Sequence, residues 1–483
     1  MKKILQYILF LMCSASYSQI VSLDESFNTT QFQQGRRVVD ILTQPDGKIL
    51  VAGNFTSYNG VEHNSLLRLN IDGSLDTTFD PGMSTGLNGQ YYITSLAMDS
   101  FGKIYVGGNF NNFNGSSKKG VVRLNADGSV DPTFTFDFFS PNSQASVVYD
   151  LAFDSSGKLL IAGNFWTTTP SWGSATGLMR VNYDGSYDNS FTRIAGDNDV
   201  IFKVLVQPDG KVLIGGYFNI STAPNDADGL ARLNADGTLD VSFLSENDVF
   251  GFIYDIYVDS NNKIILGGLF KKSFFSNQWN ILARFNDSGS VDDSFNAFEV
   301  GFLSTSNNVV YSIKPYGSDI LIGGRIPYYN GNPAGDLMLI GENGIADTSF
   351  DIGEGFESLS GAAEINCITT QDDGKIIAGG YFSSYNGSTV HGLARLLPSN
   401  LGLEVPESSQ FSTIVFSENS VVHFNASNDI SQIIVYDTLG REVLYKKGIF
   451  NKECLIDNLP AQQVLIAKVT FTNQTVQSIK LLN

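Results

Sequence analysis

Residues 38–55 read VVDILTQPDGKILVAGNF, and after a variable loop residues 66–79 read LLRLNIDGSLDTTF. Together they form one unit of a pattern that occurs seven times along the chain, so an internal repeat decides the fold. The position of Lys48 recurs at steps of 52 to 56 residues, as Lys103, Lys158, Lys211, Lys263, Asp319 and Lys375. The closing Phe79 recurs as Phe134, Phe191, Phe243, Phe295 and Phe350.

Each unit contains four short segments rich in β-branched and aromatic residues, which are typical of strands. Asp-Gly stands at two of the turns, and these residues tolerate the backbone conformation of a tight hairpin. The spacing therefore predicts four antiparallel strands per unit, about the size of one β-propeller blade. Pairs such as Gly107-Gly108 and Gly379-Gly380 end the second strand and predict close packing between neighbouring blades.

The two ends of the repeat region predict a closed ring. The seventh unit stops after Leu393-Ala394-Arg395-Leu396 without its last strand, and that strand stands at the N-terminus as Ser22-Leu23-Asp24-Glu25-Ser26-Phe27. Pairing the two would cover a strand edge, whereas an open solenoid would need capping repeats. We therefore predict an all-β fold, a seven-bladed β-propeller over residues 20–398 closed by an N-terminal strand, with a small C-terminal β-sandwich.

The run QPDGKILVAGNF followed by RLNxDGSLDxxF resembles the delta-60 β-propeller repeat family, and the resemblance covers Ser22 to Leu397. Unit six departs from the pattern: Ser318-Asp319 replaces Gly-Lys, Ile326 replaces Phe and Leu339 replaces Arg. The resemblance implies a propeller in an exported or surface protein, without a catalytic residue common to the family.

The first 18 residues resemble a secretory signal peptide. Lys2 and Lys3 precede the apolar run Ile4 to Met12, and small residues at Ser16 and Ser18 predict cleavage after Ser18. The alternatives are a lipoprotein modified at Cys13, disfavoured because Met12 stands where a small residue is needed, and a buried N-terminal strand.

Charge and composition restrict the partners. Loss of Lys2 and Lys3 takes the net charge from −19 to −21, which opposes binding to nucleic acids and anionic lipids. No long apolar run outside the N-terminus predicts a transmembrane helix in the mature chain. Cys367 and Cys454 fall in different predicted domains, so we expect buried thiols rather than a disulfide.

Residues 399–410 are the expected linker to a domain over residues 411–483. Strands are expected at 431–436, 442–445, 464–471 and 476–482, the first two forming a hairpin around Thr438-Leu439-Gly440. The segments VYDxxGREV from Val435, Leu459-Pro460-Ala461 and the terminal SIKLL resemble the C-terminal sorting domain of the bacterial type IX secretion system, although QQVL at 462–465 replaces the usual Gly-x-Tyr. The resemblance implies export across the outer membrane through the type IX machinery, with a secreted or cell-surface location. The alternative is an ordinary accessory domain.

No pattern in the sequence predicts an enzyme, and we expect no catalytic residue, cofactor or metal. His63 and His391 lie in corresponding loops of units one and seven, but no third ligand stands at a recognisable spacing. The segment Asn70-x-Asp72-Gly73-Ser74-x-Asp76 superficially resembles a calcium loop, yet Pro81 stands where an EF-hand needs Glu, so a hairpin turn is favoured. The repeated arginine, Arg68 in unit one, is expected to pair with a repeat aspartate such as Asp76.

The variable loops that join the second and third strands, and successive blades, lie on one face and are the expected binding surface. They carry five aromatic residues suited to stacking on sugars or anchoring a protein. These candidate ligand-binding residues are Trp166, Trp172, Phe274, Phe275 and Trp279. The favoured function is an exported recognition module for a glycan or a protein. A structural or adhesive surface protein, and a hydrolase or lyase acting on polysaccharide or peptide, remain alternatives.

Overall fold

A computed structural model describes residues 19–27, 32–82, 84–85, 92–136, 146–169, 172–192, 199–222, 225–243, 249–272, 279–295, 299–300, 308–329, 332–359, 361–398, 414–418, 421–437, 442–456, 459, 464–472 and 476–482. The chain divides into two compact units, Met1–Ser399 and Asn400–Asn483. The boundary falls inside the segment expected to be a linker. The described residues contain no helix with the length and hydrophobicity needed to cross a membrane.

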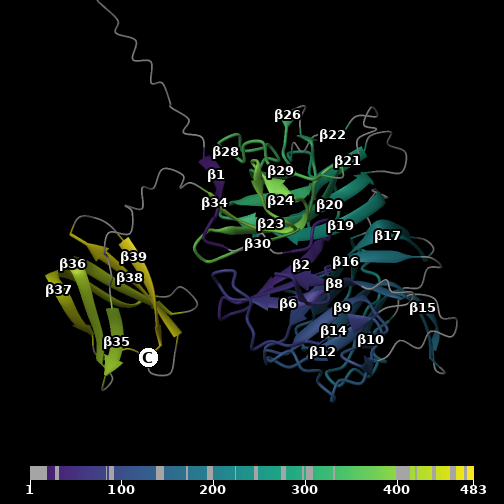
Figure 1. Ribbon diagram of the computed structural model, residues 1–483, viewed down its shortest axis with the longest axis horizontal. Coiled ribbons are helices and arrows are strands. Elements are labelled where there is room, and N and C mark those ends of the chain that lie inside the picture. The colour runs from purple at the N-terminus through teal and green to yellow at the C-terminus, as the bar shows by residue number, and fades with distance from the viewer. Residues whose placement is uncertain are drawn as a thin grey trace, which may run out of the picture. The chain divides into compact units, whose positions relative to one another are not determined.

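The first unit is built from small antiparallel sheets whose strands follow one another along the chain (Figure 1). The three-stranded sheets are β2 (Val38–Thr43), β3 (Ile49–Gly53) and β6 (Leu66–Leu69); β8 (Tyr92–Met98), β9 (Ile104–Asn109) and β12 (Val121–Leu124); β13 (Val147–Phe153), β14 (Leu159–Thr169) and β15 (Trp172–Val181); β16 (Val200–Val206), β17 (Val212–Thr222) and β18 (Asn225–Leu233); and β23 (Val309–Tyr316), β24 (Asp319–Arg325) and β27 (Leu337–Ile340). A four-stranded sheet contains β19 (Phe250–Val258), β20 (Ile264–Lys271), β21 (Trp279–Phe285) and β22 (Glu299–Val300).

A five-stranded sheet joins the two ends of this unit. Its order is β28 (Phe350–Asp351), β1 (Gln19–Leu23), β34 (Leu393–Pro398), β31 (Ile376–Tyr381) and β30 (Glu364–Thr370). Short strands in the loops form further small sheets: β4 (Ser57–Tyr58), β5 (Val61–Glu62), β7 (Ser84–Thr85), β10 (Asn112–Phe113), β11 (Ser116–Ser117), β25 (Tyr328–Tyr329), β26 (Asn332–Pro333), β29 (Phe356–Glu357), β32 (Ser384–Tyr385) and β33 (Ser388–Thr389).

The expectation of four extended strands in every unit is wrong for most units. The fourth segment makes only one bridge to the third strand, as between Leu69 and Leu75 or Leu124 and Val130. The reason is the turn that follows at once: Asp76 accepts a hydrogen bond from the backbone N–H of Thr78 at 3.0 Å, which curls the chain out of the extended conformation.

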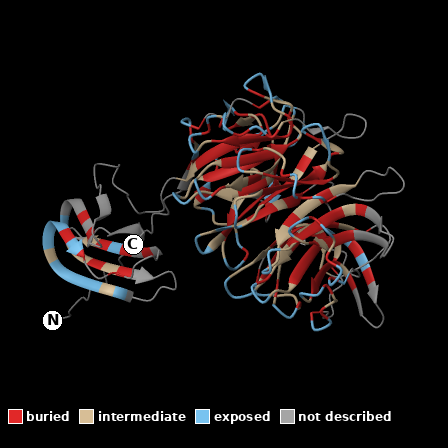
Figure 2. Cartoon of the chain, turned by 90° about the horizontal axis from the view of Figure 1, so that it is seen from below, coloured by how far each residue is buried: buried red, intermediate tan, exposed pale blue. Residues whose placement is uncertain are grey.

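The glycine pairs allow the close packing that the sequence predicted. A Cβ atom on Gly379 would lie 2.6 Å from Val38 and 2.8 Å from Ile41, on the first strand of the first sheet. One on Gly380 would lie 1.9 Å from the carbonyl oxygen of Glu364. All three distances are shorter than the contacts that real Cβ atoms make, so only glycine lets the second strand approach its two neighbours this closely. Buried residues accordingly make up much of the sheets of the first unit, while many exposed residues lie in its turns (Figure 2).

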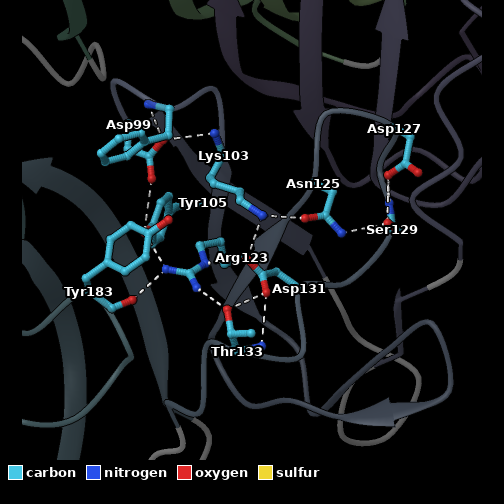
Figure 3. Close-up of polar contacts among 11 residues, drawn as sticks. Asp99, Lys103, Tyr105, Arg123, Asn125, Asp127, Ser129, Asp131, Thr133 and Tyr183 are labelled. Carbon is cyan, nitrogen blue, oxygen red and sulfur yellow. Dashed lines mark hydrogen bonds and ion pairs between the residues drawn. The ribbon is translucent and has the colours of Figure 1, made fainter.

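The repeated arginine is a buried structural residue, as expected. Arg123 is 1% exposed, and its Nε donates to Asp131 at 3.0 Å (Figure 3). Its Nη1 donates to the backbone carbonyl of Tyr183, which belongs to the next unit, at 2.5 Å. Its guanidinium also lies 5.1 Å from the ring of Phe134. Each such arginine therefore ties the strands of its own unit to the turn of the following one.

The same contact to the next unit is present in six units. The donor and acceptor pairs are Arg68 and Ala126, Arg123 and Tyr183, Arg180 and Ala235, Arg232 and Asp287, Arg284 and Glu342, and Arg395 and Ile71. In the last pair the donor Arg395 belongs to repeat unit seven and the acceptor Ile71 to repeat unit one. Unit six has Leu339 at this position and packs it in the apolar core.

Residues 22–27 supply the fourth segment that repeat unit seven lacks. Ser22 pairs with Leu397 and Leu23 with Leu396 in an antiparallel ladder. Asp24 then accepts a hydrogen bond from Arg395 at 2.8 Å, as Asp131 does from Arg123. Phe27 is 2% exposed, and the guanidinium of Arg395 lies 4.4 Å from its ring. Leu23 is only partly buried, whereas Val21 is fully buried.

The second unit has one hydrogen-bonded sheet. Its strands are β35 (Ile414–Glu418), β36 (Val421–Asp437), β37 (Glu442–Ile456), β38 (Val464–Phe471) and β39 (Val476–Leu482). The predicted hairpin is confirmed, because Val435 pairs with Leu444. Residues from both halves of β36, such as Phe424 and Val435, share one core cluster, which shows that the sheet folds over itself.

We predict that Phe27→Ala lowers the free energy of unfolding by about 3–5 kcal/mol, because it empties a buried aromatic site where the two chain ends meet. Phe101→Ala is the matched control: Phe101 is 78% exposed, and its loss should cost less than about 0.5 kcal/mol. Denaturant titration of both variants measures the difference. Equal costs would mean that Phe27 contributes no buried packing.

We predict a pH-dependent role for the repeat aspartate. Burial of Asp131 disfavours its charged form, but hydrogen bonds from Thr133 and Lys103 and the charge of Arg123 outweigh this and hold its pKa well below 3.8. The stabilisation is therefore present above about pH 4 and is lost as the pH falls below that value. Asp131→Asn should cost about 3 kcal/mol at pH 7, with a smaller difference from the unmodified chain at pH 2. An equal difference at both pH values, measured by denaturant unfolding, would contradict this.

Candidate functional site

In each sheet of the first unit, apart from the small sheets formed by the loop strands, the strand that comes first in its repeat carries a β-bulge at the same position. In β2 the register shifts between Val38 and Asp40, so that Val39 has no partner in the ladder. The equivalent residues in β8, β13, β16, β19, β23 and β30 are Thr94, Tyr149, Phe202, Tyr254, Tyr311 and Asn366. All seven bulged residues line one cavity of about 250 Å³. The first strands therefore surround a common space.

Charged residues directly after the bulges lie in this cavity and join neighbouring sheets. Asp40 accepts the backbone N–H of Leu96 at 2.7 Å, and Asp255 accepts that of Ile313 at 2.7 Å. Asp150 likewise accepts the N–H of Val204 at 3.0 Å. Each of these carboxylates thus binds the first strand of the next sheet and helps to hold the two sheets together.

Lys203 occupies the same position in β16 and lies between two of these carboxylates. Its Nζ is 3.3 Å from Asp150 and 3.4 Å from Asp255. Burial lowers the pKa of Lys203, but Asp150, Asp255 and Asp40 outweigh it, so the net shift is upward and the ammonium stays charged. Burial raises the pKa of Asp40 to about 6 despite the hydrogen bond from Leu96.

Aromatic side chains form a continuous arc around part of the cavity. Tyr149 contacts Phe202 with ring centroids 4.9 Å apart, Phe202 contacts Tyr254 at 4.8 Å, and Tyr254 contacts Tyr311 at 5.1 Å. These residues come from four successive first strands. Burial raises the pKa of Tyr254 to about 12, so its hydroxyl remains protonated and can donate a hydrogen bond at neutral pH.

The arc extends outward to an exposed aromatic stack. Tyr217 and Phe252 lie with centroids 5.0 Å apart and planes inclined by 18°, and Phe252 is nearly parallel to Tyr254 at 6.3 Å. Tyr217 is 44% exposed and Phe252 38% exposed. Phe252 precedes the bulge of β19, and Tyr217 follows the glycine pair of β17, so both lie at the end of the sheets that carries the variable loops.

Arg37 occupies the position of Phe252 in repeat unit one, and Arg325 occupies the position of Tyr217 in repeat unit six. Arg37 lies directly before β2 and Arg325 ends β24, and both contact the carboxylate of Glu364, at 2.7 Å and 3.6 Å. The guanidinium of Arg37 also lies 5.0 Å from the ring of Tyr381. We call the rim formed by Tyr217, Phe252, Arg37, Arg325, Glu364 and Tyr381 the cavity mouth.

The five predicted ligand-binding residues fall into three groups. Trp166 in β14 pairs with Thr176, and Trp172 in β15 pairs with Thr169, so both belong to a strand hairpin, but their side chains are outside the described residues. Phe274 and Phe275 also lie outside the described residues. Trp279 begins β21, is partly buried, and has the Nζ of Lys271 5.2 Å from its ring.

Several other residues that the sequence singled out lie in the described part of the chain. The Asp-Gly segments form hairpin turns, since Asp72 accepts the backbone N–H of Ser74 at 2.9 Å. Cys367 and Cys454 are buried free thiols, as expected. Nδ1 of His391 lies 3.2 Å from the carbonyl oxygen of Phe32. Within the described ranges, no group of three or more His, Cys, Asp or Glu residues could hold a metal ion.

Sequence reasoning missed Tyr217, Phe252 and the arginines of the mouth, because it searched the long loops for tryptophan. A signal for them exists in the repeat. Tyr217, Arg325 and Tyr381 each follow a glycine pair. Repeat unit one has Asn54 at the same position. Comparing residues at that position across units would have identified a variable rim on a constant framework.

Comparison with known families supports the repeat architecture. Residues 44–79, 102–134, 155–191, 207–243, 260–295 and 371–400 match the family model described as "Domain of unknown function (DUF5122) beta-propeller". Residues 401–483 match the model described as "Domain of unknown function (DUF8694)". No curated protein matches the chain.

Solved structures of several functions are similar at low identity. PorZ, an essential bacterial surface component of the type-IX secretion system of Porphyromonas gingivalis, is 13% identical with a TM-score of 0.35; the match covers 95% of this chain but only 59% of PorZ. An α-L-arabinanase of Penicillium chrysogenum complexed with arabinobiose is 11% identical, with 79% and 98% of the two chains covered and a TM-score of 0.31. The acylaminoacyl peptidase of Pyrococcus horikoshii is 12% identical, with 85% and 60% covered and a TM-score of 0.33.

The chain thus matches the DUF5122 β-propeller model in six segments between residues 44 and 400, and the DUF8694 model over residues 401–483.

Proposed function

We propose that this chain is an exported recognition protein whose repeats form a closed seven-bladed β-propeller, and that it binds a carbohydrate at the cavity mouth. Seven first strands line one cavity, which supports seven blades around an axis. Closure is supported by the ladder between β1 and β34 and by the contact of Arg395 with Ile71, which repeats the link between the other units.

The exposed stack of Tyr217 and Phe252 is the observation that carries the binding proposal. Two adjacent and partly exposed aromatic rings suit the apolar C–H faces of sugar rings, which stack on aromatic side chains. The rings continue through Tyr254 to Tyr311, which lies within electrostatic reach of Glu364 and Arg37. The carboxylate of Glu364 and the guanidinium of Arg37 offer hydrogen-bond partners for hydroxyl groups. This combination fits a glycan better than an apolar peptide surface.

A binding role also fits the acidic residues of the cavity better than a hydrolytic one. Asp40, Asp150 and Asp255 each accept a backbone N–H from the adjacent sheet. Protonating such a carboxylate in a catalytic cycle would weaken a contact between blades. An adhesive surface protein and a hydrolase are the alternatives, and the first would retain the glycan site while remaining on the cell.

The second part of the proposal is export through the type IX secretion system, directed by residues 411–483. Within the described residues, the sorting-like segment forms a defined structure: Val435 is buried in the core of the second unit, and Leu481 pairs with Leu465 in its last hairpin. A terminal unit that is compact by itself suits an element recognised by a transport machinery.

We predict that Phe252→Ala lowers glycan affinity at least tenfold, because stacking on this ring is lost. The measurement is a glycan array with the mature chain, followed by titration calorimetry on each ligand found. Phe101→Ala, which removes an exposed aromatic ring from the turn between β8 and β9 at the other end of the sheets, should leave affinity unchanged. Full retention of binding in Phe252→Ala, or no glycan bound by the unmodified chain, would reject the site.

We predict that a chain lacking residues 411–483 stays inside the cell envelope of a bacterium that has the type IX machinery. The same residues fused to the C-terminus of a periplasmic protein should carry it to the medium or the cell surface. Fractionation and immunoblotting measure both outcomes. Continued export of the truncated chain would refute the sorting role.

A further inference from the structure

The cavity mouth differs in chemistry from one side to the other. The aromatic stack lies on the sheets of β17 and β19, and the arginines lie on those of β2 and β24. Tyr311 joins the two sides: its ring contacts Tyr254, and it lies within electrostatic reach of Glu364, Arg325 and Arg37. A ligand stacked on Phe252 and extending across the mouth therefore meets the arginines next.

The arginine side presents cations outward and holds its acids inward. The side chain of Arg37 is 41% exposed and that of Arg325 is 23% exposed, whereas Glu364 is 9% exposed. The other nearby acid, Asp336, is buried and accepts the backbone N–H of Ile326 at 2.6 Å. A ligand arriving from solvent contacts guanidinium groups before it contacts a carboxylate.

Arg37 is also held in place before any ligand arrives. Glu364 binds its Nη1 at 2.7 Å, and the ring of Tyr381 lies 5.0 Å from its guanidinium carbon. A guanidinium fixed in this way loses little conformational freedom when it binds, and its planar donors match the two oxygens of a carboxylate. Arg37 thus presents a fixed and exposed positive charge, although the chain as a whole has a net charge of −19.

We propose that the glycan bound at this mouth is anionic, a uronic-acid oligosaccharide whose carboxylate pairs with Arg37 and Arg325 while a neighbouring sugar stacks on Phe252 and Tyr217. This inference rests on the carbohydrate-binding function proposed above and specifies the ligand. Both arginines point their charge to the same rim, so they act on one carboxylate or on two adjacent ones along the oligosaccharide.

The test compares the mature chain's affinity for oligogalacturonate, for the same oligomer with its carboxylates methyl-esterified, and for a sulfated dextran oligomer. We expect the carboxylate form to bind at least tenfold more tightly than the ester, and to weaken as salt is raised. We also expect it to bind more tightly than the sulfated oligomer. An alginate oligomer serves as a second uronate. Equal affinity for acid and ester forms, or preference for the sulfated oligomer, would overturn the inference.

The protein arm uses Arg37→Gln, with Arg36→Gln as a control that removes the same charge from the neighbouring position. Arg37→Gln should reduce uronate affinity about tenfold and leave any neutral glycan unaffected, while Arg36→Gln should change affinity less than twofold. Arg37→Lys keeps the charge and the contact to Glu364 but loses the planar donors, so it should be intermediate. Melting temperatures check that each variant folds.

The two proposals fail separately. If Phe252→Ala abolishes binding but Arg37→Gln and esterification have no effect, the mouth binds a glycan and the uronate assignment is wrong. If no variant of the mouth changes the binding of any glycan, the carbohydrate site itself is wrong.

Discussion

The hydrogen bond from a buried arginine to a carbonyl of the following unit is the interaction on which the rest of the structure depends. In unit two, Arg123 binds its own Asp131 and the carbonyl of Tyr183 with the same guanidinium (Figure 3). A small sheet cannot bury both of its faces alone, so each unit needs its neighbour. The fixed donors of arginine set the orientation of that neighbour in a way that apolar packing does not.

The replacement of the repeated arginine by Leu339 in repeat unit six agrees with the dependence of each repeat unit on its neighbour. In the other units the acceptor carbonyl lies in an Asn-x-Asp-Gly turn or its equivalent, and the last unit has no such turn because its fourth segment comes from the N-terminus. An arginine at position 339 would lack that acceptor, and burying an unpaired guanidinium is costly. Leu339 fills the space and joins the apolar core instead.

Much of the fold could be predicted from the sequence because the same turn residues and the same pair of charged residues recur in several repeat units. Asp-Gly marks many of the hairpins, and Arg68 and Asp76 recur with a constant separation that matches their contact. The extent of the fourth strand could not be predicted, because the Asp76 side chain competes with the ladder for the backbone N–H of Thr78.

The candidate site was less accessible to sequence reasoning. Its cavity is lined by residues that a β-bulge turns out of the normal alternation, such as Tyr149 and Tyr254, and a bulge leaves no distinctive sequence signal. The mouth brings together Arg37 and Glu364, which come from the first and the last repeat unit of the chain. Only the arrangement of the units around one cavity makes these residues neighbours, and that arrangement also explains why variation at the rim leaves the framework unchanged.

The pairing of the two chain ends is the most direct test of this account. Ser22 and Leu397 are partners in the antiparallel ladder between β1 and β34, where opposite residues lie about 5 Å apart and can form a disulfide. The doubly substituted chain Ser22→Cys, Leu397→Cys should form an intramolecular disulfide under mild oxidation, remain monomeric by mass, and melt at a higher temperature than its reduced form. Failure to form that bond, or its formation only between different chains, would contradict a ring closed by its own N-terminal strand.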